Sequence, residues 1–228
     1  MIASHDAPDS IARQLAELVQ RQAAPAAAAW FQAQLAQAAS ASGREDFLLA
    51  FASAGRRLGS APLIDTAALE PSLSRQFSGR GLDETGRAAL LLTALGAGER
   101  DSRARVADLF YKGGAGEKQA VLRALPFLAE PRKFLELAIE SVRSSVQTVF
   151  EAIACENPYP ADQFDDAAFN QLVLKALFNE VPAARIFGLE RRAGPELKRM
   201  VQGYAQERRA AGRSVPADID VICALVKE

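Results

Sequence analysis

The sequence predicts an all-α protein, and three features of its 228 residues support this fold class. Alanine is abundant, strands of alternating β-branched residues are absent, and strong helix formers fill almost every segment. A similar apolar pattern recurs at 91–95 (LLTAL), 121–125 (VLRAL) and 173–177 (VLKAL), with unequal spacing. Such a pattern is typical of stacked helical repeats. We therefore predict an irregular stack of antiparallel helix pairs, a HEAT-like α-α superhelix.

Three helices are predicted before residue 60, each with apolar residues at three- and four-residue steps. Asp9 or Ser10 can cap the first, Pro25 suits the first turn of the second, and Gly59 ends the third. The segment 60–81 has a poor helical pattern and several prolines and glycines. We divide the chain into N-terminal helices at 1–59, a connector or loop at 60–81, and a C-terminal helical array at 82–228. The array and the N-terminal helices are expected to pack as one domain.

The C-terminal array begins with three predicted helices, at 83–95, at 101–111 from Asp101, and at 117–128. A fourth follows Pro131, because apolar residues recur at helical spacing from Leu135 to Ile153. We predict one long, mostly buried helix from about residue 132 to Asn157.

A rigid corner is predicted at Asn157-Pro158-Tyr159-Pro160. Proline disfavours helical backbone in the residue before it, and asparagine tolerates the left-handed conformation that closes a helix. The two prolines are expected to hold Tyr159 extended. Asp162 suits the cap of the next helix, which runs to residue 178. A short turn at 181–188 and helices opened by Pro195 and Pro216 complete the chain.

Composition narrows the range of functions. The net charge is −1 and the pI is about 6.0, which argues against a dedicated nucleic-acid binder. No apolar run approaches the length of roughly 18 residues needed to span a membrane, so we expect a cytoplasmic protein without an integral membrane segment. His5 is the only histidine, and Cys155 and Cys223 lack the spacing of a zinc or redox motif. No metal and no cofactor is predicted.

Charge is segregated along the C-terminal half. Residues 151–180 hold six acidic residues against Lys175, and residues 185–213 hold eight basic residues against three acidic ones. We expect the two segments to face each other. One interpretation is a set of interhelical ion pairs. The other is a site in which guanidinium groups bind a phosphate or carboxylate, from the four arginines Arg185, Arg191, Arg192 and Arg213.

A second candidate site consists of Asn157, Tyr159, Asn170 and Lys175, at the predicted corner and on the helix after it. These side chains either form hydrogen bonds with one another and so fix the corner, or they line a pocket between the two helices. In the pocket, Asn157 and Asn170 would supply hydrogen bonds and Tyr159 a wall. A magnesium site among the aspartates of 162–166 is the weaker interpretation, because helix capping explains two of the three.

Five segments carry a resemblance to a known family. They are AVLRALPFL (120–128), FEAIACENPYPADQF (150–164), FNQLVLKALF (169–178), RIFGLERR (185–192) and ELKRMVQGYAQERRAAGRSVPADI (196–219). In these segments the chain resembles the EboA family, and the first hundred residues match only loosely. The family-like polar positions are Glu151, Asn157, Tyr159, Asn170, Gln171, Lys175, Arg185, Arg191, Arg192, Tyr204, Glu207, Arg208 and Arg213.

The resemblance implies a pathway rather than a mechanism. Family members are encoded beside a TatD-like hydrolase, a UbiA-like prenyltransferase, a dehydroquinate-synthase-like cyclase and a sugar-isomerase-like protein. That gene cluster is associated with making a secondary metabolite or moving it towards the periplasm. We therefore expect a non-catalytic accessory protein, a helical scaffold or metabolite-binding module. Its partners would be other proteins of the cluster or a small anionic or prenylated metabolite.

Two alternatives remain open at this point. In the first, the chain is an enzyme acting on a phosphorylated or prenylated intermediate. The arginines would hold anionic oxygens, and Glu151 or an aspartate of 162–166 would serve as acid or base. In the second, the arginine-rich segment attaches the protein to a membrane surface, although no long basic amphipathic helix is evident.

Overall fold

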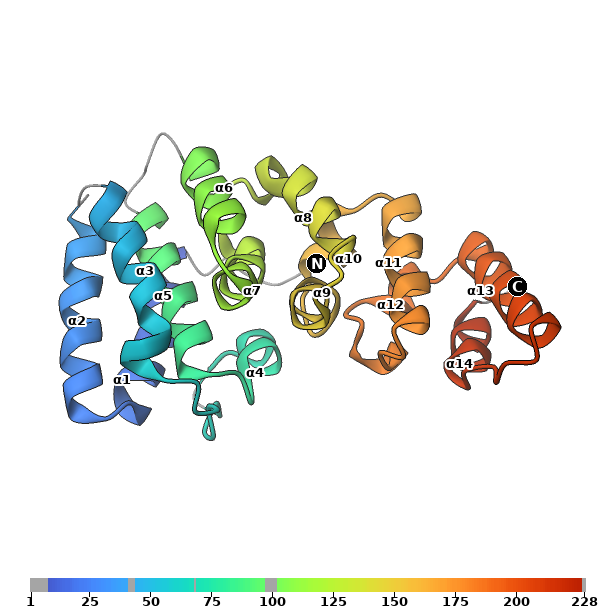
Figure 1. Cartoon of the computed structure of the whole chain (residues 1–228), viewed down its shortest axis with the longest axis horizontal. Coiled ribbons are helices and arrows are strands. Elements are labelled where there is room, and N and C mark those ends of the chain that lie inside the picture. The colour runs from blue at the N-terminus through green and yellow to red at the C-terminus, as the bar shows by residue number, and fades with distance from the viewer. Residues whose placement is uncertain (1–7, 41–43, 68, 97–101, 227–228) are drawn as a thin grey trace. The chain divides into compact units, whose positions relative to one another are not determined.

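The computed structural model describes residues 8–40, 44–67, 69–96 and 102–226. These residues form fourteen α-helices and three short 3-10 helices, with no strand among them (Figure 1). The prediction of an all-α protein is confirmed, and the HEAT-like superhelix stays a prediction. His5 and Asp101 lie outside the described residues.

The α-helices are α1 (Pro8–Gln22), α2 (Pro25–Ala39), α3 (Arg44–Leu58), α4 (Pro71–Phe77), α5 (Leu82–Gly96), α6 (Ser102–Lys112), α7 (Ala115–Ala124), α8 (Leu135–Val142), α9 (Gln147–Ala154), α10 (Tyr159–Gln163), α11 (Asp166–Phe178), α12 (Leu189–Arg192), α13 (Pro195–Ala210) and α14 (Asp218–Leu225). The 3-10 helices are η1 (Leu125–Phe127), η2 (Pro131–Phe134) and η3 (Ala183–Arg185). α2 and α13 begin at the predicted prolines, and α3 ends before Gly59, which has a φ of +75°. α1 starts earlier than expected, so Asp9 and Ser10 lie within it.

The chain divides into two compact units, Met1–Phe134 and Leu135–Glu228. In the first unit α5 is the central helix, because α1, α2, α3 and α7 all pack against it. Residues on every side of α5 are buried, including Leu90, Leu91 and Leu92. A helix that is apolar all round is expected in such a position.

The segment 60–81, expected as a connector or loop, contains helix α4. Leu73 and Phe77 of this helix are buried in the first unit. The ends of the segment are joined by backbone hydrogen bonds from Leu63 N–H to Arg80 O (2.7 Å) and from Leu82 N–H to Ala61 O (2.9 Å). The segment is therefore a packed part of the first unit.

The single long helix expected from residue 132 to 157 is wrong, because the structure has two helices there. α8 ends at Val142, α9 begins at Gln147, and a turn separates them. The Oγ of Ser144 accepts a hydrogen bond from the Val146 N–H (3.1 Å), and such a serine bond competes with helical hydrogen bonding. The spacing of apolar residues does not indicate this interruption, because both helices bury their apolar residues.

The corner between α9 and α11 also differs from its prediction. Glu156, not Asn157, takes the left-handed conformation, with a φ of +53°. Tyr159 is not extended, because it begins the short helix α10. Asp162 lies inside α10, and Asp165 caps α11 by accepting a hydrogen bond from the Ala168 N–H (2.7 Å). The residue preferences for helix caps are met by both Asp162 and Asp165, so the sequence alone did not decide between them.

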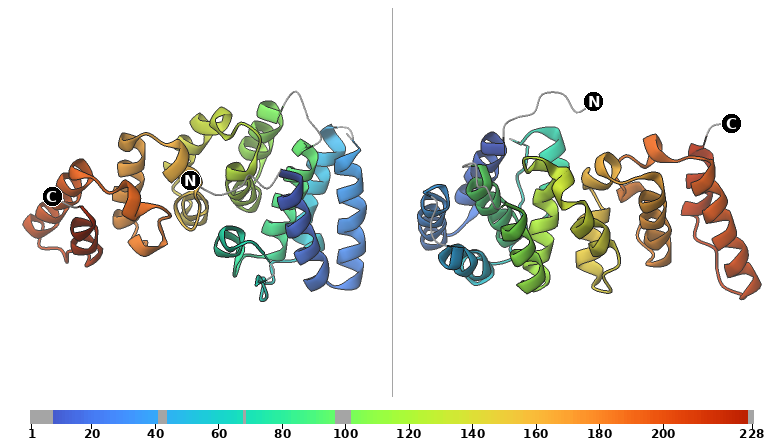
Figure 2. Two further views of the ribbon diagram at one scale, coloured as in Figure 1. Left: turned by 180° about the vertical axis from the view of Figure 1, so that it is seen from behind. Right: turned by 90° about the horizontal axis from the view of Figure 1, so that it is seen from above.

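In the second unit α11 contacts both α9 and α13, and Figure 2 shows it between these two helices. Its buried residues are Phe169, Asn170, Leu172, Val173, Ala176 and Leu177. They cover two sides of the helix, as a helix between two neighbours requires. The remaining side carries Gln171 and Lys175 and faces a groove beside α8.

Candidate functional site

Arg185 is bonded to two glutamates. Its Nε and Nη2 donate to the two carboxylate oxygens of Glu156 (2.9 and 3.2 Å), and its Nη1 donates to Glu151 Oε2 (2.8 Å). The hydrogen bonds to Glu156, and to a smaller extent the one to Glu151, raise the pKa of Arg185 above its ordinary value. Burial acts in the opposite direction. The backbone joins the same residues, because the Glu156 N–H donates to Arg185 O (2.8 Å). These bonds hold the loop before α12 to the end of α9.

Arg191 and Arg192 are bonded to α10 and to the start of α11. Arg191 Nη2 donates to Asp162 Oδ1 (2.6 Å). Arg192 donates to the carbonyl oxygens of Ala161 (2.6 Å) and Phe164 (3.0 Å) and to Asp166 Oδ1 (2.9 Å). Its guanidinium also lies over the ring of Phe169, 4.8 Å from the centroid.

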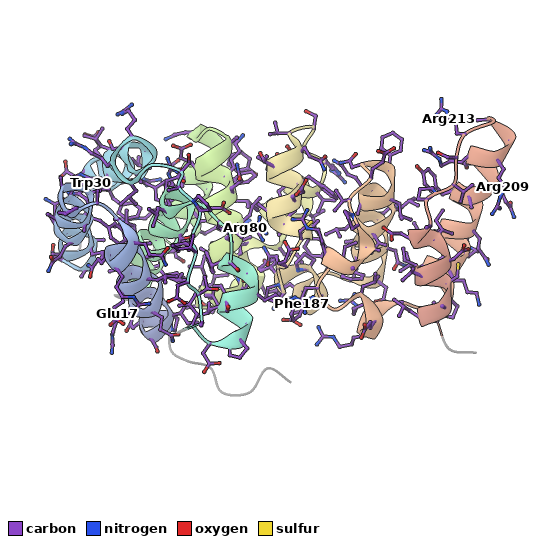
Figure 3. All side chains as sticks on the ribbon, turned by 90° about the horizontal axis from the view of Figure 1, so that it is seen from below. Glu17, Trp30, Arg80, Phe187, Arg209 and Arg213 are labelled. Carbon is purple, nitrogen blue, oxygen red and sulfur yellow. The ribbon has the colours of Figure 1, made fainter. Side chains whose placement is uncertain are left out.

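The predicted facing of the acidic and basic segments is confirmed by these ion pairs. The arginines do not converge on a common point, since each is bonded to a different part of the corner. Arg213 is exposed and follows the end of α13, near the exposed Arg209 in the last turn of that helix (Figure 3). The four-arginine anion site stays a prediction, and the contacts described here favour structural roles for Arg185, Arg191 and Arg192.

Asn157 and Tyr159 are buried, each with 1% of its surface exposed. Asn157 Nδ2 donates to Ala152 O (2.9 Å), and its Oδ1 accepts from the Tyr159 N–H (3.0 Å). The Tyr159 ring packs edge-on against Phe164, with 6.3 Å between the centroids. These bonds are internal to the corner and involve two of the four residues predicted there. Both alternatives for the four-residue set stay predictions. Asn170 is also buried, on α11.

Lys175 reaches across from α11 to the turn between α8 and α9. Its Nζ donates to the carbonyl oxygens of Val142 (2.6 Å) and Ser144 (2.7 Å), and it lies 5.1 Å from the centre of the Phe150 ring. The end of a helix leaves carbonyl oxygens without helical partners, and Lys175 supplies donors for them. Burial lowers the pKa of the Lys175 ammonium from its ordinary value.

A groove of about 490 Å³ lies beside Lys175 in the second unit. It is lined by Ile139, Val142, Arg143, Phe164, Asp165, Ala167, Ala168, Gln171 and Lys175. Most of these side chains are apolar, and the charged ones are Arg143, Asp165 and Lys175. Of the residues predicted for the anion or corner site, only Lys175 lines this groove. Asp165, one of the aspartates considered for a magnesium or acid-base role, lines it as well.

Arg143 is the groove residue that sequence reasoning missed as a candidate. The continuous helix predicted from about residue 132 to 157 puts Arg143 in a helix interior, where an arginine is expected to be an ordinary solvent-exposed residue. In the structure it is the first residue after α8, and it lines the groove. The adjacent pair Ser144-Ser145 was the available signal, because serines favour helix ends over helix interiors.

Buried arginines in the first unit were also missed. Arg87 on α5 is 4% exposed, and it is bonded to Phe51 O (2.9 Å), Asp83 (2.8 Å) and Glu117 (3.1 Å). Arg123 on α7 is 1% exposed and bonded to Glu84 (3.2 Å). Buried charges need such partners, so these residues hold α3, α5 and α7 together.

Among the described residues, no cluster of three or more His, Cys, Asp or Glu side chains is arranged to hold a metal ion. The acids of the corner are engaged as described above, with Asp162 and Asp166 in ion pairs and Asp165 in the cap. None of the described helices is long and apolar enough to cross a membrane.

The comparisons with known proteins give one match. Neither the curated proteins nor the solved structures contain a match to this sequence. The family model described as "Metabolite traffic protein EboA" matches residues 11–223. It thus extends into both compact units and includes residues 11–100, where the resemblance seen in the sequence was loose. The chain therefore belongs to the EboA metabolite traffic protein family.

Proposed function

We propose that this protein binds a small metabolite without transforming it, and that it does so in the groove between α8 and α11. The groove itself is the observation that carries this proposal. Its volume of about 490 Å³ falls in the range of small-molecule sites, roughly 300–1,000 Å³. Its walls are mostly apolar and include a few polar groups, which is also the usual composition of such sites. Binding and release of a metabolite agree with membership of a metabolite traffic family.

The contacts of the acidic residues support binding over catalysis. Glu151 is bonded to Arg185, Asp162 to Arg191 and Asp166 to Arg192. A general acid or base must lie within hydrogen-bond reach of a substrate, and these three carboxylates already accept hydrogen bonds from arginine guanidinium groups. The enzyme alternative stays a prediction, and these three carboxylates are engaged in ion pairs within the protein.

A second hollow, of about 550 Å³, lies on the first unit between α1, α2 and α5. The charged residues that line it are Asp9, Glu17 and Arg13. We favour the groove of the second unit because it contains Lys175, a residue that the sequence already indicated as a candidate. A scaffold role, in which the helices hold another protein of the pathway, is the alternative that the same experiment tests.

The test is native mass spectrometry of the protein purified gently from its own host, compared with the denatured protein. We expect a discrete small-molecule mass that is lost on denaturation. Ala167→Trp should abolish it, because Ala167 is an exposed helical residue that lines the groove and an indole would fill the space. Ala33→Trp is the matched control, since Ala33 is an exposed alanine on α2 that lines neither hollow.

Two outcomes would contradict the proposal. One is a stoichiometric protein partner with no small molecule, which would favour the scaffold role. The other is a bound molecule that Ala167→Trp and Ala33→Trp retain equally, which would place the site elsewhere. Turnover of the bound molecule by the purified protein would instead support the enzyme alternative.

A further inference from the structure

The groove has an apolar wall and a charged end. Ile139, Val142, Phe164, Ala167 and Ala168 supply the apolar surface. Val142 and Phe164 are buried, so this wall is continuous with the core of the unit. Burial of apolar ligand surface there is favourable at about 25 cal/mol per Å². This part of the groove suits the hydrocarbon body of a ligand, because its apolar side chains offer neither a charge nor a hydrogen bond to a charged head group.

The Lys175 ammonium forms part of the charged end. An ammonium has three N–H donors, and two of those on Lys175 are directed at Val142 O and Ser144 O. The third can donate to a ligand in the groove that Lys175 lines. Carbonyl oxygens carry no net charge, so these bonds fix the position of the ammonium without neutralising it. Burial disfavours its charge, and an anion placed beside it would remove that penalty.

The remaining charges of the groove favour a ligand with a single anionic group. Arg143 lies just after α8 and adds a second positive charge. Asp165 is the one acidic residue in the lining, and its Oδ1 accepts the hydrogen bond from the Ala168 N–H that caps α11. The lining therefore has two basic side chains against one acidic one. Gln171, which is uncharged, supplies both a hydrogen-bond donor and an acceptor.

We infer that the groove binds a free amphiphilic anion, a small molecule with an apolar body and one terminal carboxylate or phosphate. The head group lies at Lys175 and Arg143, and the body lies along Ile139, Phe164 and Ala168. This inference rests on the proposed function and specifies its ligand class. It differs from the four-arginine site predicted from the sequence, since none of those arginines lines the groove.

The test measures the affinity of the full-length protein for four probes by isothermal titration calorimetry. Octyl phosphate and octanoate carry both the apolar body and the anion, octan-1-ol has only the body, and inorganic phosphate has only the anion. We expect octyl phosphate and octanoate to bind about tenfold or more tightly than octan-1-ol, because they gain a charge-assisted hydrogen bond. Inorganic phosphate should bind more weakly than octyl phosphate, because it buries no apolar surface.

Variants locate the head group. Lys175→Met should weaken octyl phosphate binding about tenfold, and Lys175→Arg should retain most of it, because a cation remains. Lys118→Met is the matched control, since Lys118 is a half-buried lysine over an aromatic ring, that of Phe110, in the other unit. If Lys175→Met does not fold, Arg143→Gln serves instead, because Arg143 is exposed. Its control is Arg209→Gln on α13, outside the groove.

Several results would overturn the inference. Equal affinity for octan-1-ol and octyl phosphate would show that the groove does not select an anion. Equal losses in Lys175→Met and Lys118→Met would mean that the head group does not lie at Lys175. Binding to vesicles of anionic lipid, lost in Lys175→Met and without affinity for the free octyl compounds, would identify a membrane surface as the ligand.

Failure of the inference can be told apart from failure of the proposed function. A neutral or cationic molecule that co-purifies with the protein and is lost in Ala167→Trp would overturn the inference alone. The absence of any small molecule, together with no binding of any probe, would overturn both.

Discussion

Lys175 and Arg185 are both partly buried cations of the second unit, and they differ in the groups that accept their hydrogen bonds. Arg185 is bonded to the carboxylates of Glu156 and Glu151, which raise its pKa. Lys175 is bonded to two backbone carbonyl oxygens, and burial lowers its pKa. The charge of Arg185 is thus neutralised within the protein. The charge of Lys175 is positioned but not neutralised, which suits it to an anionic ligand.

The lowered pKa of Lys175 predicts how anion binding depends on pH. In the free protein this pKa lies below the ordinary lysine value of 10.5. A bound anion favours the ammonium, so affinity should be constant at mildly alkaline pH, where the phosphate is fully ionised, and fall as pH rises through the pKa of the free protein. The fall should therefore begin below pH 10.5. Calorimetric titration with octyl phosphate at increasing pH measures this loss of affinity. The other charged residues that line the groove are Arg143 and Asp165.

The control for this prediction is Lys175→Arg. A guanidinium keeps its charge throughout this pH range, so the variant should bind octyl phosphate with little change in affinity. An alkaline loss of the same size in Lys175→Arg and in the unmodified protein would contradict a role for the Lys175 ammonium.

At the scale of the helices, the interrupted path from α8 to α11 creates the groove. A continuous helix through residues 143–146 would have left Arg143 on a regular helical turn. Instead the turn after α8 exposes the carbonyl oxygens of Val142 and Ser144, to which Lys175 donates. The short helix α10 then brings the chain to the cap of α11, where Asp165, Ala167 and Ala168 complete the lining.

The cap of α11 gives a test at this scale. Asp165→Ala removes the hydrogen bond to the Ala168 N–H and should lower the free energy of unfolding by about 1 kcal/mol. Asp162→Ala should cost less, because Asp162 lies within α10 and its ion pair with Arg191 is largely exposed. Urea denaturation followed by circular dichroism measures both. A larger loss for Asp162→Ala would instead support the cap predicted from the sequence.

At the scale of the whole molecule, charge is nearly balanced. The chain has 27 lysines and arginines against 28 aspartates and glutamates, a net charge of −1. Many of these charges are paired within one unit, as Arg87 is with Glu117 in the first and Arg185 is with Glu156 in the second. Such a molecule has little overall attraction for anionic surfaces. Selection of an anion must then come from the local arrangement in the groove.

This balance predicts that the protein is not retained by anionic lipid vesicles. Co-sedimentation with phosphatidylserine-containing vesicles at low ionic strength should recover no more protein than neutral vesicles do, because screening is weakest there and any attraction would be clearest. Recovery that is higher on anionic vesicles and falls with added salt would contradict this. It would revive attachment through the arginine-rich segment 185–213.

The all-α fold class, the starts of α2 and α13 and the end of α3 were predicted correctly from the sequence. These features depend on neighbouring residues, because proline fixes its own φ angle and glycine permits a positive one. The pairing of the acidic and basic segments was also predictable, since the opposite charges lie in blocks that adjoin along the chain. Family membership followed from motifs of the C-terminal half, and the match over residues 11–223 confirms it.

The groove was decided by tertiary structure. The Lys175 Nζ meets Val142 O and Ser144 O from 33 and 31 residues away, and no local pattern encodes that distance. The buried Arg87 likewise depends on Glu117, 30 residues further along. Sequence periodicity reports which side of a helix is apolar, whereas a helix break or a buried charge is stable only when a distant segment supplies its hydrogen-bond partner. The fold class and several helix ends of this protein were therefore determined by local sequence, whereas the break between α8 and α9 and the candidate binding site were decided by contacts between helices.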